Sequence, residues 1–178
     1  ATNRRKELEM SCTRHMAAIG LVIVIALVAT GCENSAPDPA ERAAIEKVVD
    51  GYLGALAEAY SNLDVAPLEE WASPNEVVRV RNLLKGLAQT GDRVESTERT
   101  HHVEHLEVFR EINATVRLVE VWDVVRYDAF TGVEKGRTED SIQNTLLQLR
   151  LVDGRWIVIG RTVMNTETPL SGVVEENG

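Results

Sequence analysis

Three histidines within five residues form the most concentrated group of possible metal ligands in this sequence. His101, His102 and His105 stand with Glu104 in the segment Thr100–His105. On a helix, His101 and His105 would lie one turn apart and could share a zinc ion. The surrounding pattern instead favours a β-strand, on which residues four apart are separated by about 13 Å. We therefore expect a partly exposed polar strand here and no metal site.

A second reactive side chain, the thiol of Cys32, follows a short apolar run. The run Ala17–Ala29 carries no charge, has Arg14 on its N-terminal side, and leads through Thr30 and Gly31 to Cys32. It is shorter than the roughly 20 residues that a helix needs to cross a bilayer. It matches the apolar core of a secretory signal, which spans roughly 7–15 residues.

The segment Ala29-Thr30-Gly31-Cys32 resembles the lipobox of bacterial lipoproteins, in which cleavage precedes the cysteine and the thiol carries a diacylglycerol. The segment departs from the usual pattern at Ala29, where leucine is commoner. The resemblance implies a signal peptide over residues 1–31, lipidation of Cys32, and a domain anchored to membrane on the extracytoplasmic face of a bacterial cell envelope. An uncleaved signal anchor and ordinary secretion are the alternatives.

The composition limits the partners of the mature chain. Cleavage before Cys32 would leave 147 of the 178 residues and remove four basic and two acidic residues, so the net charge would become −11. Such a chain repels phosphate backbones, which excludes nucleic acid as an expected partner. The only cysteines are Cys12 and Cys32, so a lipidated mature chain has no thiols left for a disulfide.

The N-terminal half shows helical periodicity after a short polar tether over residues 32–38. Asp38-Pro39-Ala40-Glu41 provides an N-cap, a first-turn proline and an acidic residue, and apolar residues then recur at helical spacing from Ile45 to Leu63. The segment Asp64–Trp71 is predicted to form a short second helix or turn. Ser73-Pro74-Asn75-Glu76 repeats the capping pattern and predicts a third helix that ends at Gly91.

The C-terminal half changes to a period of two, which predicts long strands. The expected strands begin at Thr97, at Ile112 and at Arg137, and Asp153-Gly154 predicts a two-residue hairpin turn before the last one. The hairpin would pair Leu151 with Trp156 and Leu149 with Val158 on the core face. Arg150 would pair with Ile157, and Gln148 with Ile159, on the other face. The acidic segment 167–178 is expected to be a flexible tail.

Helices followed by strands predict an α+β domain, with about three N-terminal helices packed on a curved four-stranded antiparallel sheet. Over residues 39–166 the chain resembles the nuclear transport factor 2-like (cystatin-like) cone fold. The order of its elements is similar to the IMS domain of chloroplast-division proteins. The segments that carry this resemblance are VVDGYLGALAEAY (Val48–Tyr60), LEEWASP (Leu68–Pro74), ATVRLVEVWDVVRYD (Ala114–Asp128) and LLQLRLVDGRWIVIG (Leu146–Gly160).

The resemblance implies where catalysis would take place, because enzymes with this fold place an acid or base inside the cone. The candidates are Asp123, His105, Tyr52, Tyr60 and Tyr127. A carboxylate in an apolar pocket has a raised pKa and can transfer protons. No catalytic motif of the family matches these positions residue by residue, however, so no catalytic residue is assigned and no cofactor is expected.

Aromatic residues are the candidates for a ligand pocket at the mouth of the cone. Trp71, Trp122 and Trp156, together with Tyr52, are expected either to line such a pocket or to belong to the core.

The sequence therefore predicts a lipid-anchored, non-enzymatic domain that binds a protein partner, as an accessory subunit of a cell-envelope assembly. The alternatives are a domain that binds a small apolar ligand in the cone and, less favoured, a small isomerase- or hydrolase-like enzyme.

Overall fold

The first long element is helix α2 (Pro39–Asn62), and it begins where the capping residues predict. The computed structural model describes residues 34–167, so the predicted signal peptide, Cys32 and residues 168–178 of the predicted tail lie outside the described residues. The side chain of Asp38 accepts hydrogen bonds from the backbone N–H groups of Ala40 and Glu41, both at 2.8 Å. These bonds satisfy donors that the first turn of a helix would otherwise leave free.

Within residues 34–167, two α-helices are present rather than the expected three. The segment predicted as a second helix or turn forms a short 3₁₀ turn, η1 (Ala66–Glu70), with Pro67 near its start and Leu68 fully buried. A stretch this short cannot complete the i to i−4 hydrogen-bond pattern of an α-helix, and Pro74 then opens the next element. Helix α3 (Pro74–Gln89) follows, capped by the Ser73 hydroxyl.

The four long strands of the C-terminal half and the short β1 form one antiparallel sheet, in which strands that are neighbours in sequence are neighbours in space. Its order is β1-β2-β3-β4-β5. The strands are β1 (Asn34–Ser35), β2 (Asp92–Phe109), β3 (Asn113–Asp128), β4 (Glu134–Val152) and β5 (Arg155–Glu167). The four long strands confirm the predicted α+β class. The two-residue β1 lies in the segment predicted as a tether, where it pairs with the free edge of β2, Asn34 opposite Phe109.

Two long strands start earlier than expected. Strand β2 begins at Asp92 rather than Thr97, and β4 begins at Glu134 rather than Arg137. Polar residues obscure the alternation in both places, because Ser96 occupies an inward position of β2 and the start of β4 is exposed and charged.

The final hairpin follows the predicted register only near its turn. Leu151 pairs with Trp156, Arg150 with Ile157 and Leu149 with Val158, as expected. The prediction that Gln148 pairs with Ile159 is wrong, because a bulge places Gly160 opposite Gln148. The extra residue changes the phase of β5, so that Arg161 lies opposite the buried Leu147.

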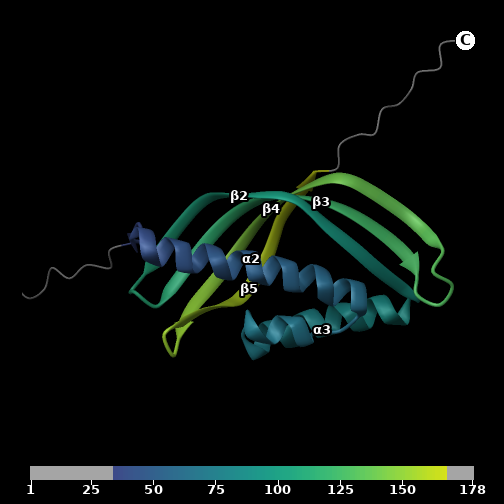
Figure 1. Ribbon diagram of the computed structural model, residues 1–178, viewed down its shortest axis with the longest axis horizontal. Coiled ribbons are helices and arrows are strands. Elements are labelled where there is room, and N and C mark those ends of the chain that lie inside the picture. Colours follow the sequence, from purple (N-terminus) through teal and green to yellow (C-terminus); the bar gives the residue numbers. More distant parts are fainter. Residues whose placement is uncertain (1–33, 168–178) are drawn as a thin grey trace, which may run out of the picture. The chain divides into compact units, whose positions relative to one another are not determined.

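Both helices cover the concave face of the sheet, and the hydrophobic core lies between the helices and the sheet (Figure 1). Helix α2 contributes Ile45, Val49, Tyr52 and Leu53, all fully buried. The sheet contributes inward-facing aliphatic residues, which include Val116, Leu118, Leu147, Leu149 and Val158.

A close approach between α2 and the residue after η1 makes one helical glycine sensitive to substitution. A Cβ atom on Gly51 would lie 2.5 Å from the Trp71 ring, whereas one on Gly54 would meet nothing within 4 Å. We expect Gly54→Ala to stabilise the fold by about 0.5–1 kcal/mol through helix propensity. We expect Gly51→Ala to destabilise it relative to Gly54→Ala by about 1–3 kcal/mol, because Trp71 must move. Urea denaturation of both variants checks this, and equal stabilities would contradict the packing shown here.

Candidate functional site

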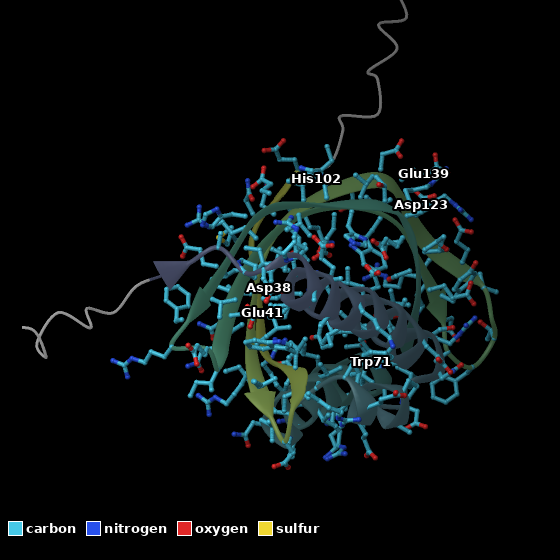
Figure 2. The ribbon with its side chains drawn as sticks, turned by 60° about the vertical axis from the view of Figure 1, so that its left-hand side comes forward. Asp38, Glu41, Trp71, His102, Asp123 and Glu139 are labelled. Atoms are coloured by element: carbon cyan, nitrogen blue, oxygen red, sulfur yellow. The ribbon has the colours of Figure 1, made fainter. Side chains whose placement is uncertain are left out.

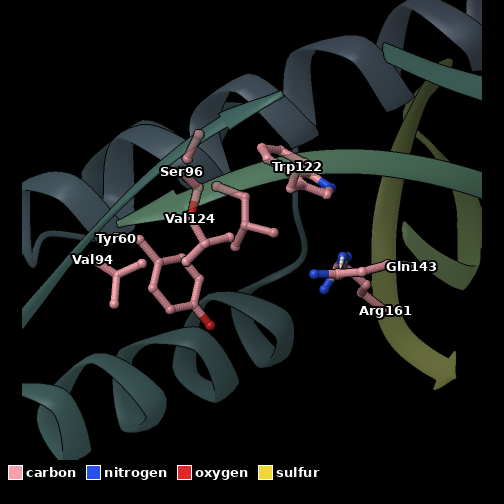
Figure 3. Close-up of a pocket in the computed structure, with 9 residues that line it drawn as sticks. Tyr60, Val94, Ser96, Trp122, Val124, Gln143 and Arg161 are labelled. Atoms are coloured by element: carbon pink, nitrogen blue, oxygen red, sulfur yellow. Dashed lines mark hydrogen bonds between the residues drawn. The ribbon is translucent and has the colours of Figure 1, made fainter. Parts of the chain in front are cut away.

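The concave face of the sheet holds a pocket of about 230 Å³ beside the C-terminal half of α2 (Figure 3). Residues from α2, β2, β3, β4 and β5 contribute to it. The lining residues are Leu56, Ala57, Tyr60, Val94, Ser96, Trp122, Val124, Gln143 and Arg161. Most of this lining is apolar or aromatic, and a few polar groups are fixed among it.

A buried ion pair forms the polar side of the pocket. Nη2 of Arg161 donates to Oε2 of Glu120 at 2.9 Å, and it also lies 3.1 Å from Oε1 of Gln143. Glu120 is fully buried and the Arg161 side chain is 14% exposed. Charges removed from water in this way need each other, since an isolated buried charge is strongly destabilising.

The same carboxylate fixes the aromatic wall. Nε1 of Trp122 donates to Oε2 of Glu120 at 2.7 Å, so this oxygen holds both Trp122 and Arg161 in place. Oε1 of Glu120 and Nε of Arg161 are buried without a hydrogen-bond partner within the described residues. Buried polar atoms in folded proteins normally have a hydrogen-bond partner, which can be an ordered water.

Tyr60 lies across the pocket from Arg161 and Gln143 (Figure 3). Burial raises the pKa of its phenol above the ordinary value, and the positive charge of Arg161 offsets only part of this effect. The Tyr60 hydroxyl therefore stays protonated at neutral pH and can donate a hydrogen bond into the pocket.

The four predicted pocket residues do not come together in one site. Trp122 lines the pocket on the concave face. Trp71 and Trp156 line a separate hollow of about 260 Å³ near the β4–β5 turn. Tyr52 belongs to the core, where its hydroxyl donates to Oε1 of Glu76 at 2.6 Å.

The contact between Tyr52 and Glu76 joins the two helices. Glu76 is buried on α3 and also accepts two hydrogen bonds from Arg79, at 2.8 and 2.6 Å. Burial, followed by the negative charge of Glu76, raises the pKa of Tyr52 far above its ordinary value. Tyr52 is thus a neutral structural donor between α2 and α3 and has no access to the pocket lining.

Three of the catalytic candidates lie away from the pocket. Asp123 falls between two inward-facing residues and points to the outer face of the sheet (Figure 2). There it accepts a hydrogen bond from the backbone N–H of Asp140 and pairs with Arg99, and both contacts lower its pKa. His105 pairs with Glu107 at 2.7 Å, and Tyr127 lies beneath the guanidinium of Arg93. Tyr60 is the catalytic candidate that does line the pocket.

The histidine segment forms part of β2, as predicted. His101 contacts Asp50 of α2 at 3.1 Å through Nε2 and Glu98 through Nδ1, while His102 lies on the outer side of the sheet (Figure 2). Among the described residues, no group of three or more His, Cys, Asp or Glu side chains is placed to hold a metal ion.

Sequence reasoning missed Glu120, Gln143 and Arg161. Glu120 has the same phase in β3 as Leu118 and Trp122, so continued alternation would have placed it inside. The signal for Arg161 was weaker. That signal is the preceding residue, Gly160, because a glycine within a strand often marks a bulge, and a bulge changes which face the next residue occupies.

Comparison with solved structures supports the cone-like fold. The crystal structure of the intermembrane space region of chloroplast protein ARC6 is 14% identical, with a TM-score of 0.55 over 67% of this chain and 92% of that one. This similarity shows a shared fold. A protein of unknown function with a cystatin-like fold from Nostoc punctiforme is 11% identical, with a TM-score of 0.43 over 77% of this chain and 98% of that one. A putative calcium/calmodulin dependent protein kinase II association domain from Xanthomonas campestris is 16% identical, with a TM-score of 0.37 over 80% of this chain and 99% of that one.

No family model and no curated protein matches the chain. Within residues 34–167, no helix is long and apolar enough to span a membrane.

The ion pair predicts a specific pattern of stability. We expect Arg161→Met to lower the free energy of unfolding by about 3–5 kcal/mol, because it leaves the charge of Glu120 buried without a partner. Adding Glu120→Gln should recover more than half of the loss, since the amide still accepts from Trp122. Urea unfolding of the single and double variants measures the coupling. Arg150→Met, on an exposed arginine of the same sheet, is the control. A loss in Arg161→Met no larger than in this control would contradict the role of the pair.

Proposed function

We propose that this protein is a lipid-anchored, extracytoplasmic, non-enzymatic binding domain whose concave pocket takes a small, mostly apolar molecule. The pocket on the concave face, with its fixed polar side, is the observation that carries this proposal. Binding sites for small molecules are typically concave, largely apolar, and provided with a few polar groups that orient the ligand.

The size of the pocket limits the occupant. Its volume of about 230 Å³ is below the roughly 300–1,000 Å³ of sites for drug-sized ligands. A single ring with a short substituent is the scale of molecule that fits. The polar contacts available to it come from Tyr60, Ser96, Gln143 and Arg161.

The placement of the acid–base candidates supports binding rather than catalysis. Asp123, His105 and Tyr127 are engaged with other side chains away from the pocket lining. Glu120 is the carboxylate beside the pocket, and its Oε2 is held by both Arg161 and Trp122. Because this oxygen is already occupied by two donors and Glu120 is not among the residues that line the pocket, the carboxylate is poorly placed to take a proton from a ligand.

The predicted protein partner remains a second candidate, favoured by the turn between β3 and β4. Phe130 is 87% exposed and Val133 is 62% exposed. Asp128 holds the turn together: it accepts from the backbone N–H groups of Phe130 and Thr131 and pairs with Lys135 at 3.1 Å. These contacts hold the pKa of Asp128 well below its usual range. Aromatic residues, phenylalanine included, are enriched at protein–protein interfaces relative to the rest of the surface.

The described chain begins at the end of β2 that lies away from the β3–β4 turn. Asn34, two residues after Cys32, pairs with Phe109 at one end of β2, whereas Asp92 pairs with Asp128 at the other. An extended strand rises about 3.3 Å per residue, so up to about 55 Å of strand separates the two ends. The β3–β4 turn therefore lies at the end of β2 remote from the proposed anchor.

Filling the pocket tests the leading proposal. We expect Ala57→Phe to weaken binding of acetophenone, used as a probe, at least tenfold, because the new ring occupies the space that the ligand needs. Ala43→Phe, at an exposed position of the same helix, should leave binding unchanged. Ligand-observed NMR titration measures both. Equal binding by the two variants would exclude the pocket as the site.

Removing the exposed aromatic side chain tests the second candidate. We expect Phe130→Ser to abolish co-purification of a stoichiometric partner after mild detergent extraction, while changing stability by less than about 0.5 kcal/mol. Ile112→Ser, at the exposed turn at the other end of β2, serves as the control. Mass analysis of the extracted complexes decides the question, and loss of the partner in the control alone would rule out the Phe130 turn.

Removing the thiol tests the proposed anchor. We expect Cys32→Ser to accumulate as an uncleaved, unlipidated precursor when the full chain is produced in a bacterial host. Cys12→Ser should be processed normally, because Cys12 would leave with the signal peptide. Intact mass and labelling with radioactive palmitate report both events. A Cys32→Ser protein that is still cleaved and lipidated would overturn the assignment.

A further inference from the structure

The charge inside the pocket is already balanced before any ligand arrives. Arg161 is the charged residue among the nine that line the pocket. Its Nη2 atom is 2.9 Å from Oε2 of the fully buried Glu120, and the two groups together carry no net charge. The carboxylate is hydrogen-bonded to the guanidinium, so the pocket contains an ion pair rather than a free cation.

The remaining polar lining consists of neutral groups. The Oε1 atom of Gln143 is used by Arg161 at 3.1 Å, which leaves its amide NH₂ as a donor. The Tyr60 hydroxyl is protonated at neutral pH, since the ordinary pKa of a tyrosine is about 10 and burial raises it further. Both groups can donate to an acceptor on a ligand, and neither brings a positive charge that an anion would require.

An anionic ligand is therefore disfavoured on two grounds. A carboxylate entering the pocket loses its hydration, which is costly unless a charged partner replaces the water. The partner available is Arg161, whose charge Glu120 already neutralises at close range. A second carboxylate would also be repelled by the first. A neutral carbonyl oxygen needs only the donors and avoids both costs.

We infer that the natural ligand is a small neutral molecule, mostly hydrocarbon, that carries one hydrogen-bond acceptor such as a carbonyl oxygen and is not a carboxylic acid. This inference rests on the proposed function and specifies the chemical class of its ligand. The same geometry makes Glu120 the residue that determines selectivity, because it cancels the charge of Arg161.

Three probes of nearly the same size test the inference. Acetophenone offers a neutral carbonyl, benzoate an ionised carboxylate, and cumene an apolar group without an acceptor. Ligand-observed NMR titrations at pH 7 measure all three with the full-length protein in detergent. We expect acetophenone to bind at least tenfold more tightly than benzoate, and several-fold more tightly than cumene. The variant Gln143→Leu should reduce the preference for acetophenone over cumene.

The variant Glu120→Gln gives an independent result. Its amide can still accept from Trp122, but the charge of Arg161 is no longer balanced, so benzoate should gain at least tenfold relative to acetophenone. Thermal unfolding first shows whether the variant is folded. If it is not, the comparison of the three probes on the unaltered protein still decides the inference.

The possible failures are distinguishable. Benzoate binding as tightly as acetophenone, or equal binding of all three probes, would overturn the neutral-acceptor class while leaving a ligand-binding pocket in place. No binding of any probe, and no shift between Ala57→Phe and Ala43→Phe, would overturn the proposed function itself. A folded Glu120→Gln protein with unchanged selectivity would overturn the role assigned to Glu120.

Discussion

The ion pair between Glu120 and Arg161 is the interaction on which the concave face depends. The two residues belong to β3 and β5, so their contact at 2.9 Å crosses the intervening strand β4. Nη2 of Arg161 also contacts Gln143, which belongs to β4. Moving either charge from water costs several kcal/mol, so three strands must keep their register for this pair to form. The side chain of Trp122 bonds to the same carboxylate, and the wall of the pocket therefore depends on the pair as well.

The bulge in β5 explains why this arrangement was hard to predict. A regular hairpin after Asp153-Gly154 would place Arg161 opposite Leu146, with its side chain on the outer face. The extra residue moves Arg161 opposite Leu147 instead, and the guanidinium then points inward. Periodicity describes a strand only until its first irregularity, and a bulge depends on the sheet as a whole. The turn and the pairs nearest to it were predictable, because they follow from the two turn residues and local alternation.

The starts of the helices were also predictable, because they depend on interactions between residues close in sequence. Asp38 and Ser73 cap the two helices through their own side chains, so the helix starts could be predicted from the sequence. The role of Trp71 was not readable in this way. Its backbone carbonyl accepts from Val158 N–H at 2.8 Å, and the next-but-one residue, Ser73, donates to the Val158 carbonyl. The connection between η1 and α3 thus pairs with part of the open edge of β5, which limits edge-to-edge association. A contact between segments so distant in sequence leaves no periodic pattern.

The two proposed binding features occupy the same end of the sheet. Val94 and Val124 of the pocket lie within a few residues of Asp92 and Asp128, which pair at the base of the β3–β4 turn. Lys135 bonds to both of these carboxylates, at 2.8 and 3.1 Å, and so fixes the turn onto the strands that form the pocket. The chain enters at the other end, where Asn34 pairs with Phe109. If the proposed anchor is attached there, the pocket and Phe130 lie at the opposite end of the sheet, and the proposed attachment is separated from the proposed binding surfaces.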